Sequence, residues 1–346
     1  MSLKVGMIGG GYFGRFHINA WRRIENTELI GVADLSETRR GELSTLYPDL
    51  VLHPDIHALL AAGPPDILDV AVPPAHQADL IRPLLGRIRT IICQKPFCRS
   101  LTEAEDLTRA AEQAGTTLIV HENFRFMPWY RAIRDEIDNG RLGAVRQACF
   151  RLRPGDGGGA DAYLSRQPYF RDMERFLVHE TGIHWIDVFR FLFGEPETIY
   201  ADLWRANPAI KGEDAGLMIL SWPNGLRATL DANRTLDHAA ENHRLTMGEF
   251  TLEGENATIT LDGHGQLACR SRGATGSVEI PYDLEDRDFG GDCVFRFQQH
   301  VISHLLSDTP LETLAKDYLQ NIRIEESAYR SAEQRQQISL QKQKHK

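Results

Sequence analysis

The sequence has few of the features that mark membrane, secreted or nucleic-acid-binding proteins. None of its apolar runs is long enough to span a bilayer, and we expect neither a membrane segment nor a secretory signal peptide. Its five cysteines are odd in number and form no C-x-x-C pair, which disfavours a disulfide framework and a zinc site and predicts a cytoplasmic location. A net charge of −9 disfavours nucleic acid as a partner.

The chain also lacks internal repeats and low-complexity linkers, so the domain boundary has to be inferred from the pattern of apolar and polar residues. Its 346 residues exceed what one hydrophobic core usually supports, and we expect two domains. Apolar strand-like runs alternate with amphipathic segments as far as residue 122. This alternation predicts an α/β domain over residues 1–122, with a doubly wound parallel sheet and helices on both of its faces.

From residue 123 onwards the pattern changes to that of an α+β domain, which we expect over residues 123–346. The runs between residues 198 and 280 are short, alternating and separated by hairpin turns, which predicts an antiparallel sheet. The two C-terminal helices are candidates to pack back on the first domain. We expect helices at 129–139, 176–193, 294–306 and 314–335, a strand at 145–152, and an irregular glycine-rich loop at 154–159.

The most informative local pattern is a glycine-rich turn between the first strand and the first helix. Gly9, Gly11 and Gly14 have the G-x-G-x-x-G spacing, and Asp34 follows twenty residues after the last glycine. In a dinucleotide site the first glycine permits the tight turn, the second lets the pyrophosphate approach, and the third lets the helix pack on the strand. The acid accepts hydrogen bonds from a ribose, which favours NAD, while Arg39 leaves NADP as an alternative.

Polar residues follow three of the expected parallel strands, where ligands bind in open α/β sheets. A fourth group lies on the expected helix 176–193, where the spacing of Glu180, His184 and Asp187 places all three on one face. A carboxylate beside an imidazole suits a general base. The five-residue spacing of His179 and His184 does not suit a zinc protease. The groups at the strand ends are Pro73 with His76, Gln94-Lys95-Pro96, and His121-Glu122-Asn123-Phe124-Arg125.

Each of these residues also has a purely structural interpretation. A histidine on a buried helix is often a core residue, Lys95 alone could be a surface lysine, and Asn123 and Arg125 could lie at a domain interface. The glycines at 155 and 157–159 are typical of a mobile loop, and mobile loops also cover active sites. They begin a segment, residues 155–175, in which we expect the residues that decide the substrate. It offers Tyr163, Arg166, Tyr169 and Arg171 either for substrate recognition or for packing.

Taken together, these motifs resemble the glucose–fructose oxidoreductase, inositol dehydrogenase and rhizopine-catabolism (Gfo/Idh/MocA) oxidoreductases over nearly the whole chain. The resemblance rests on residues 9–17, 72–76, 94–96, 123–128, 180–187 and Gly212-Glu213-Asp214. It implies an N-terminal Rossmann domain, a C-terminal domain with a large open antiparallel sheet, and a homodimer or homotetramer formed through that sheet. It also implies an NAD(P)-dependent reaction at a secondary alcohol of a sugar, inositol or related polyol.

The resemblance assigns roles to individual residues, with no metal. Lys95 would hydrogen-bond the reacting oxygen, His184 would accept the proton, and Glu180 would orient His184. Asn123, Arg125, Tyr169 and Asp187 would face the substrate. The residues expected to bind the cofactor are Gly9, Gly11, Tyr12, Phe13, Gly14, Asp34, Arg39, Val72, Pro73, His76, Gln94 and Lys95.

Two departures from the family pattern concern the chemistry directly. The usual Glu-Lys-Pro motif has Gln94 in place of glutamate, and the usual aspartate four residues before the histidine is Glu180. The same scaffold also supports glycoside hydrolysis with an internal redox cycle, imine or enal reduction, and cofactor binding without turnover. The sequence therefore leaves these as alternatives to the dehydrogenase.

Overall fold

The computed structural model describes residues 2–340, which form two compact units. The first contains the chain up to Asn123 together with Val294–Gln320. The second contains Phe124–Cys293 together with the residues from Asn321 onwards. The division after Asn123 is one residue beyond the expected boundary, and residues 294–320 belong to the first unit.

The first unit is built on a parallel sheet, as predicted, with six strands among the described residues in the order β3-β2-β1-β4-β5-β6. This is the order of a dinucleotide-binding Rossmann sheet. The edge strand β3 has only two residues, too few for a periodic pattern, and was not predicted. The strands are β1 (Leu3–Ile8), β2 (Thr27–Ala33), β3 (Leu52–His53), β4 (Ile67–Val70), β5 (Thr90–Gln94) and β6 (Thr117–His121).

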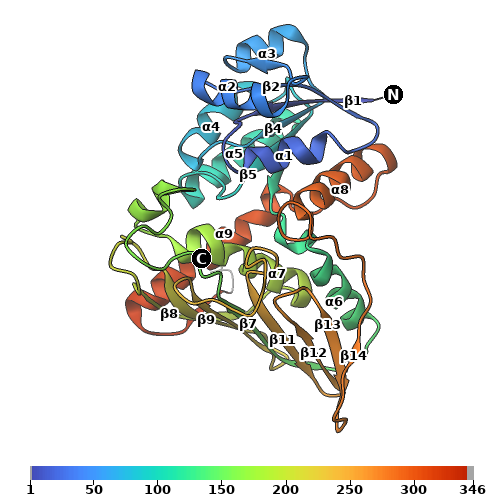
Figure 1. The fold of residues 1–346 in the computed structure, drawn as a ribbon, viewed down its shortest axis with the longest axis vertical. Coiled ribbons are helices and arrows are strands. Elements are labelled where there is room, and N and C mark those ends of the chain that lie inside the picture. Colours follow the sequence, from blue (N-terminus) through green and yellow to red (C-terminus); the bar gives the residue numbers. More distant parts are fainter. Residues whose placement is uncertain (1, 341–346) are drawn as a thin grey trace. The chain divides into compact units, whose positions relative to one another are not determined.

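The helices of the first unit surround this sheet (Figure 1) and begin at side-chain caps where the sequence supplies them. Ser100, for example, accepts a hydrogen bond from the amide of Glu103, and Gly115 ends the same helix in the left-handed conformation. Helix α4 ends at Ile81 in a short 3-10 turn, because Pro83 lacks the amide needed to continue the α-helix. The helices are α1 (Gly14–Trp21), α2 (Glu37–Leu46), α3 (Ile56–Ala62), α4 (Pro74–Ile81), α5 (Leu101–Ala114) and α8 (Cys293–Ser307).

The second unit contains a larger sheet, with nine strands in the described part, and it corrects one expectation. Most pairs are antiparallel, but β7 and β10 run parallel. The reason is that β7, the first of these strands in the chain, is inserted between the meander β8-β9-β10 and the meander β11-β12-β13-β14. The strands are β7 (Val145–Leu152), β8 (Thr198–Trp204), β9 (Ala215–Ser221), β10 (Arg227–Asn233), β11 (Gly248–Gly254), β12 (Ala257–Leu261), β13 (Leu267–Ser271), β14 (Val278–Glu279) and β15 (Ile338–Ser339).

Helices α6 (Pro128–Asp138) and α7 (Ile183–Phe193) cover one face of this sheet (Figure 1). Their aromatic side chains form the core with those of the central strands. The ring of Trp185 lies 4.3 Å from that of Phe150, and the rings of Tyr130 and Phe189 lie 6.2 and 6.3 Å from that of Phe250. This packing anchors α7, which carries His184, to the central strands β7 and β11.

The expected long helix 176–193 has a different first turn. Residues Leu177–Gly182 form a π-helical turn, and the α-helix begins only at Ile183. Such turns occur frequently at functional sites. His184 and Asp187 lie three apart within α7 and so share a face. Glu180 lies in the π-helical turn before α7, so its position does not follow the 3.6-residue period of that helix.

The last helix, α9, spans Ala315–Gln334.

Candidate active site

The carboxyl ends of the parallel strands bring most of the expected cofactor residues to one edge of the first unit. Each of five strands ends one or two residues before a predicted group. Because the strands are parallel, these ends lie along the same edge, as predicted. The glycine turn follows β1, Asp34 follows β2, Val72 and Pro73 follow β4, Lys95 follows β5 and Asn123 follows β6.

The glycine turn has the geometry that a bound pyrophosphate requires. Gly9 has a φ of +93°, and a Cβ there would lie 2.4 Å from the carbonyl oxygen of Ala71. A Cβ on Gly14 would lie 2.4 Å from the carbonyl oxygen of Gly9, so this glycine allows α1 to pack against the turn. A Cβ on Gly11, in contrast, would meet no atom within 4 Å. The backbone at Gly11 is therefore open to a ligand, and the residues present fit a dinucleotide.

Asp34 is fixed beside this turn by backbone amides. Its Oδ2 accepts a hydrogen bond of 2.8 Å from the amide of Gly10, and its Oδ1 accepts one of 2.9 Å from the amide of Ser36. The neighbouring Arg39 forms an ion pair of 2.7 Å with Glu42. The carboxylate is thus positioned to recognise a ribose, while the charge of the nearest predicted arginine is already balanced.

The loop that carries Lys95 is held by a residue that sequence reasoning missed, Gln77. Its buried amide nitrogen donates to the carbonyl oxygens of Gln94 at 2.7 Å and Pro96 at 3.1 Å. Its amide oxygen accepts a 2.7 Å hydrogen bond from the amide of Cys98. These bonds fix the backbone on both sides of Lys95, whose side chain is partly exposed. Gln77 follows the Pro73–His76 motif in α4, and only this proximity could have drawn attention to it.

In the second unit, the glycine-rich loop is irregular as predicted, but an ion pair fixes it. Asp156 Oδ2 accepts hydrogen bonds of 2.7 Å from Arg234 and 2.7 Å from Arg166. The fully buried Arg234 also donates to Tyr163 and Thr181. Burial disfavours the Asp156 carboxylate, yet the charges and hydrogen bonds of the two arginines outweigh this and lower its pKa. No sequence pattern pointed to Arg234.

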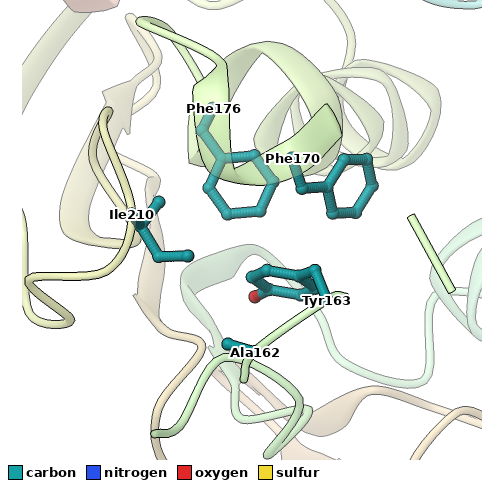
Figure 2. Packing of buried hydrophobic residues seen from close by; sticks show 5 residues of the cluster. All are labelled: Ala162, Tyr163, Phe170, Phe176 and Ile210. Atoms are coloured by element: carbon teal, nitrogen blue, oxygen red, sulfur yellow. The ribbon is translucent and has the colours of Figure 1, made fainter. Parts of the chain in front are cut away.

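An apolar cluster, with Arg234 against it, anchors the rest of the segment. Tyr163, Phe170 and Phe176 pack with Ala162 and Ile210 (Figure 2). The aromatic rings lie 4.9–5.4 Å from one another. Because Phe176 immediately precedes the π-helical turn, this packing joins the loop to the element that leads into His184.

We expect Asp156→Asn to destabilise the protein by about 3 kcal/mol at pH 7, because it leaves the buried Arg234 without its ionic partner. A carboxyl whose pKa is lowered by folding contributes stability above its unfolded pKa, about 3.9. That contribution disappears as the pH falls through the folded pKa. The stability difference between wild type and variant should therefore narrow between about pH 5 and pH 3, as measured by urea unfolding.

Asp161→Asn is the matched control, because Asp161 is exposed in the same segment. An equal loss of stability in both variants, or a difference that widens in acid, would contradict the assigned role of the Asp156 ion pair.

Tyr169 and Glu180, two predicted site residues, interact electrostatically. Burial of the Tyr169 hydroxyl, followed by the charge of Glu180, raises the pKa of this tyrosine. The ring itself is half exposed, and the amide of Gln167 donates to its hydroxyl at 3.0 Å. The tyrosine therefore stays protonated at neutral pH and can donate a hydrogen bond.

His184 is buried at the first turn of α7 and is held by an aromatic ring. Its imidazole stacks on Phe124, with centroids 3.6 Å apart and planes 3° from parallel. Phe124 is itself packed edge-on against Trp185 at 5.2 Å. This stack fixes the plane of the imidazole, so its ring nitrogens are presented in a defined direction.

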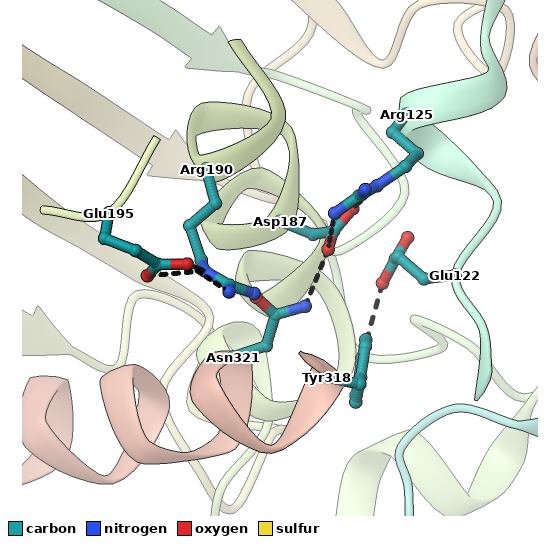
Figure 3. Close-up of polar contacts among 7 residues, drawn as sticks. All are labelled: Glu122, Arg125, Asp187, Arg190, Glu195, Tyr318 and Asn321. Carbon is teal, nitrogen blue, oxygen red and sulfur yellow. Dashed lines mark hydrogen bonds and ion pairs between the residues drawn. The ribbon is translucent and has the colours of Figure 1, made fainter. Parts of the chain in front are cut away.

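Arg125 and Asp187, both expected to face substrate, bind each other. Two hydrogen bonds of 2.7 and 2.6 Å join the guanidinium to the buried carboxylate (Figure 3). Asn321 also donates to Asp187 at 2.7 Å and accepts from Arg190. A bidentate pair of this kind fixes both side chains. Their contact with substrate stays a prediction.

Figure 3 also shows a contact within the first unit, where the hydroxyl of Tyr318 donates a hydrogen bond of 3.3 Å to Glu122.

Glu213, from the Gly212-Glu213-Asp214 motif, caps the π-helical turn. Its Oε1 accepts hydrogen bonds from the amides of Phe176 and Val178 at 3.2 and 3.1 Å, and from the hydroxyl of Tyr329 at 2.6 Å. Burial and the charge of Glu213 raise the pKa of Tyr329. The sequence motif therefore has a structural role, since it supports the turn that precedes His184.

Comparison with known proteins places this geometry in a family. Residues 3–122 match the model described as "Oxidoreductase family, NAD-binding Rossmann fold". Residues 130–260 match the "GFO/IDH/MocA C-terminal domain". The chain belongs to the Gfo/Idh/MocA oxidoreductase family. The resemblance inferred from the motifs is thereby confirmed, and so are the fold class and the NAD-binding first domain.

Two relatives and one solved structure match along nearly the full length of the chain. It is 29% identical to a D-apiose dehydrogenase of Paraburkholderia graminis, over 97% of this chain and 89% of that protein. It is 30% identical to a D-apiose dehydrogenase of Rhizobium rhizogenes, over 96% and 95%. An oxidoreductase of Agrobacterium radiobacter, solved in complex with NAD+, L-tartaric acid and magnesium, superimposes with a TM-score of 0.87 at 27% identity, over 98% and 99%.

These findings establish an NAD-binding oxidoreductase and do not favour the glycosidase or the regulator. Over residues 2–340, no helix is long and apolar enough to cross a membrane. In the same residues, no group of three or more histidine, cysteine and acidic side chains is arranged to hold a metal ion.

Proposed function

We propose that this protein is an NAD-dependent dehydrogenase that oxidises a secondary alcohol of a sugar or polyol, with D-apiose the first candidate. The observation that carries the proposal is the end-to-end similarity to two D-apiose dehydrogenases in a chain that retains both Lys95 and His184. The inositol 2-dehydrogenase of Rhizobium meliloti, 28% identical over 56% of this chain, supports the wider class of cyclic polyols.

In this proposal the protein positions the alcohol and handles its proton. NAD, held by the glycine turn and Asp34, supplies the two-electron acceptor. Lys95 donates a hydrogen bond to the alcohol oxygen as negative charge develops on it. His184 accepts the hydroxyl proton, and Glu180 orients the imidazole.

The remaining predicted residues shape the substrate side in this proposal. Arg125 and Asp187 act as one ion pair, so we propose that they fix the wall of the site jointly. Tyr169 donates its hydroxyl hydrogen bond to the substrate, and Asn123 contributes its side-chain amide.

An absorbance assay of the reduced nicotinamide tests the proposal directly. The purified protein is incubated with NAD and, separately, NADP, and with D-apiose, myo-inositol, other aldoses and sugar acids. We expect reduced cofactor to accumulate with NAD and one compound class. A flat trace across the panel, with NAD binding demonstrated by calorimetry, would overturn the dehydrogenase proposal.

Asp34 should determine the choice between NAD and NADP. We expect Asp34→Ser to weaken NAD binding about tenfold and to raise the affinity for NADP relative to NAD, because a carboxylate repels a 2′-phosphate. Titration of both cofactors by calorimetry measures the ratio.

Glu37→Gln serves as the control, since it removes one exposed negative charge from the first turn of α2. The same change of preference in this variant would show that net charge, and not the ribose-binding carboxylate, sets the selectivity.

We further propose a cytoplasmic homodimer or homotetramer formed through the outer face of the large sheet. A row of half-exposed side chains crosses this face from strand to strand, and none of the side chains in the row is charged. The row contains Tyr200, Ile219, Thr229, Cys149 and Thr251. Apolar and hydroxyl side chains of this kind suit an interface between copies. None of the five cysteines forms a disulfide in the described structure, which suits a reducing compartment.

A further inference from the structure

A chain of buried polar side chains in the first unit leads to the backbone of Lys95. Asp69, on β4, lies 2.8 Å from His17 Nδ1. The other ring nitrogen of His17 lies 3.0 Å from the amide nitrogen of Gln94, on β5. The amide oxygen of Gln94 then accepts a 2.7 Å hydrogen bond from the backbone amide of Lys95. His17 and Asp69 are fully buried, and Gln94 is nearly so.

The direction of every hydrogen bond in this chain follows from one fixed donor. The backbone N–H of Lys95 can only donate, so the oxygen of the Gln94 amide must face it. The nitrogen of that amide must then face His17 Nε2, which has to accept. The His17 proton consequently lies on Nδ1, where it donates to Asp69.

Asp69 and His17 are both held firmly by their surroundings. Asp69 Oδ2 also accepts hydrogen bonds from Trp21 at 2.7 Å and from Gln298 at 3.3 Å. The His17 ring packs against His121, with centroids 4.0 Å apart, and His121 packs in turn against Phe297. This packing fixes the plane of the His17 ring, so that each of its nitrogens faces one partner.

We propose that Gln94 is a positioning residue for Lys95 and that it holds His17 as the neutral Nδ1–H tautomer. The role given to Lys95 rests on the proposed function. The Gln94 side chain bridges two groups: its nitrogen donates to His17 Nε2, and its oxygen accepts from the backbone N–H of Lys95. Together with Gln77, which binds the carbonyl oxygens of Gln94 and Pro96, it fixes the lysine loop from both sides.

The usual glutamate of the family would impose a different protonation state here. A carboxylate can accept from the Lys95 amide, but its second oxygen also requires a donor. The network would then have to take up one proton, and where both carboxylates stay ionised this proton lies on His17, which then carries protons on both nitrogens. The charged or titratable groups that face His17 are Asp69 from β4 and His121 from β6; Gln94, Trp21 and Phe13 are neutral.

Nitrogen NMR of the full-length protein, with labelled histidine, tests the proposal without any need for substrate. The His17 ring is assigned through its contact with His121. We expect the wild type to show a protonated Nδ1 and an unprotonated Nε2, and Gln94→Glu to show both nitrogens protonated at neutral pH. A wild-type His17 that is doubly protonated, or protonated on Nε2, would overturn the proposal. So would unchanged His17 signals in Gln94→Glu while carbon NMR shows the introduced carboxyl to be ionised.

Kinetics then test the positioning of Lys95. We expect Gln94→Glu to lower kcat at least about tenfold, since small displacements of a catalytic group are costly. NAD affinity should change little, because the Gln94 amide, which the sequence predicted to contact the cofactor, is engaged by His17 and by the backbone amide of Lys95. Gln113→Glu makes the same chemical change at an exposed position of α5 and should leave kcat unchanged. Wild-type kcat in Gln94→Glu would refute the positioning role. Absence of turnover in the wild type would count against the proposed function, while the NMR result still decides the tautomer.

Discussion

His184→Ala should lower kcat for the oxidised sugar or polyol by about 100-fold or more, the usual contribution of a general base. The imidazole is buried, and its stacking on Phe124 at 3.6 Å fixes its plane. No other histidine lies on α7 to take over the role. NAD binding should stay within about twofold of wild type, because the glycine turn and Asp34 belong to the other unit. Steady-state kinetics with each cofactor, and calorimetry with NAD alone, measure the two quantities.

His264→Ala provides the control for this substitution, because His264 is exposed in the turn between β12 and β13. It should retain wild-type kinetics. If His184→Ala weakened NAD binding and turnover equally, the histidine would have a structural role and the assignment as proton acceptor would be wrong.

Gly11→Val should raise the dissociation constant for NAD by about 100-fold or more without unfolding the protein. A Cβ at Gly11 meets no atom of the chain within 4 Å, so the folded protein can accommodate it. The added side chain would occupy the space through which a pyrophosphate approaches the turn. Calorimetry gives the affinity, and thermal unfolding should change by no more than about 2 °C.

Gly9→Val is the informative contrast, because its Cβ would lie 2.4 Å from the carbonyl oxygen of Ala71. The positive φ of +93° adds backbone strain. We expect this variant to be destabilised by several degrees or to remain insoluble. Tight NAD binding by Gly11→Val would show that the cofactor does not cross this turn.

The cofactor half of the site could be predicted from the sequence because its residues are encoded locally. The strand, the three glycines, the helix and Asp34 follow one another within thirty-two residues, from Leu3 to Asp34. The parallel sheet then brings the later strand ends to the same edge. Gln77 was not predicted, because its role depends on hydrogen bonds to the carbonyl oxygens of Gln94 and Pro96, which are distant in the sequence. No local sequence pattern indicates these bonds.

The second unit was less predictable because its important contacts join distant segments. The π-helical turn before His184 depends on Glu213, thirty-three residues after Glu180. The sequence of that turn has the apolar spacing of an ordinary helix. Arg234 lies at the end of an alternating strand, and only the fold shows that it closes the glycine-rich loop through Asp156. The Asp187 carboxylate was predicted as a site residue, but its pairing with Arg125 was not.

The central position of β7 has a consequence for how the second unit forms. Gln147 pairs with Arg227, 80 residues later in the chain, and Phe150 pairs with Phe250, 100 residues later. During synthesis β7 therefore has both of its edges unpaired until the two separate meanders have been made. Such sequence-distant pairing slows folding and exposes strand edges to other chains. The second unit should consequently depend more on dilution, low temperature or chaperones to reach its native state than the first unit does.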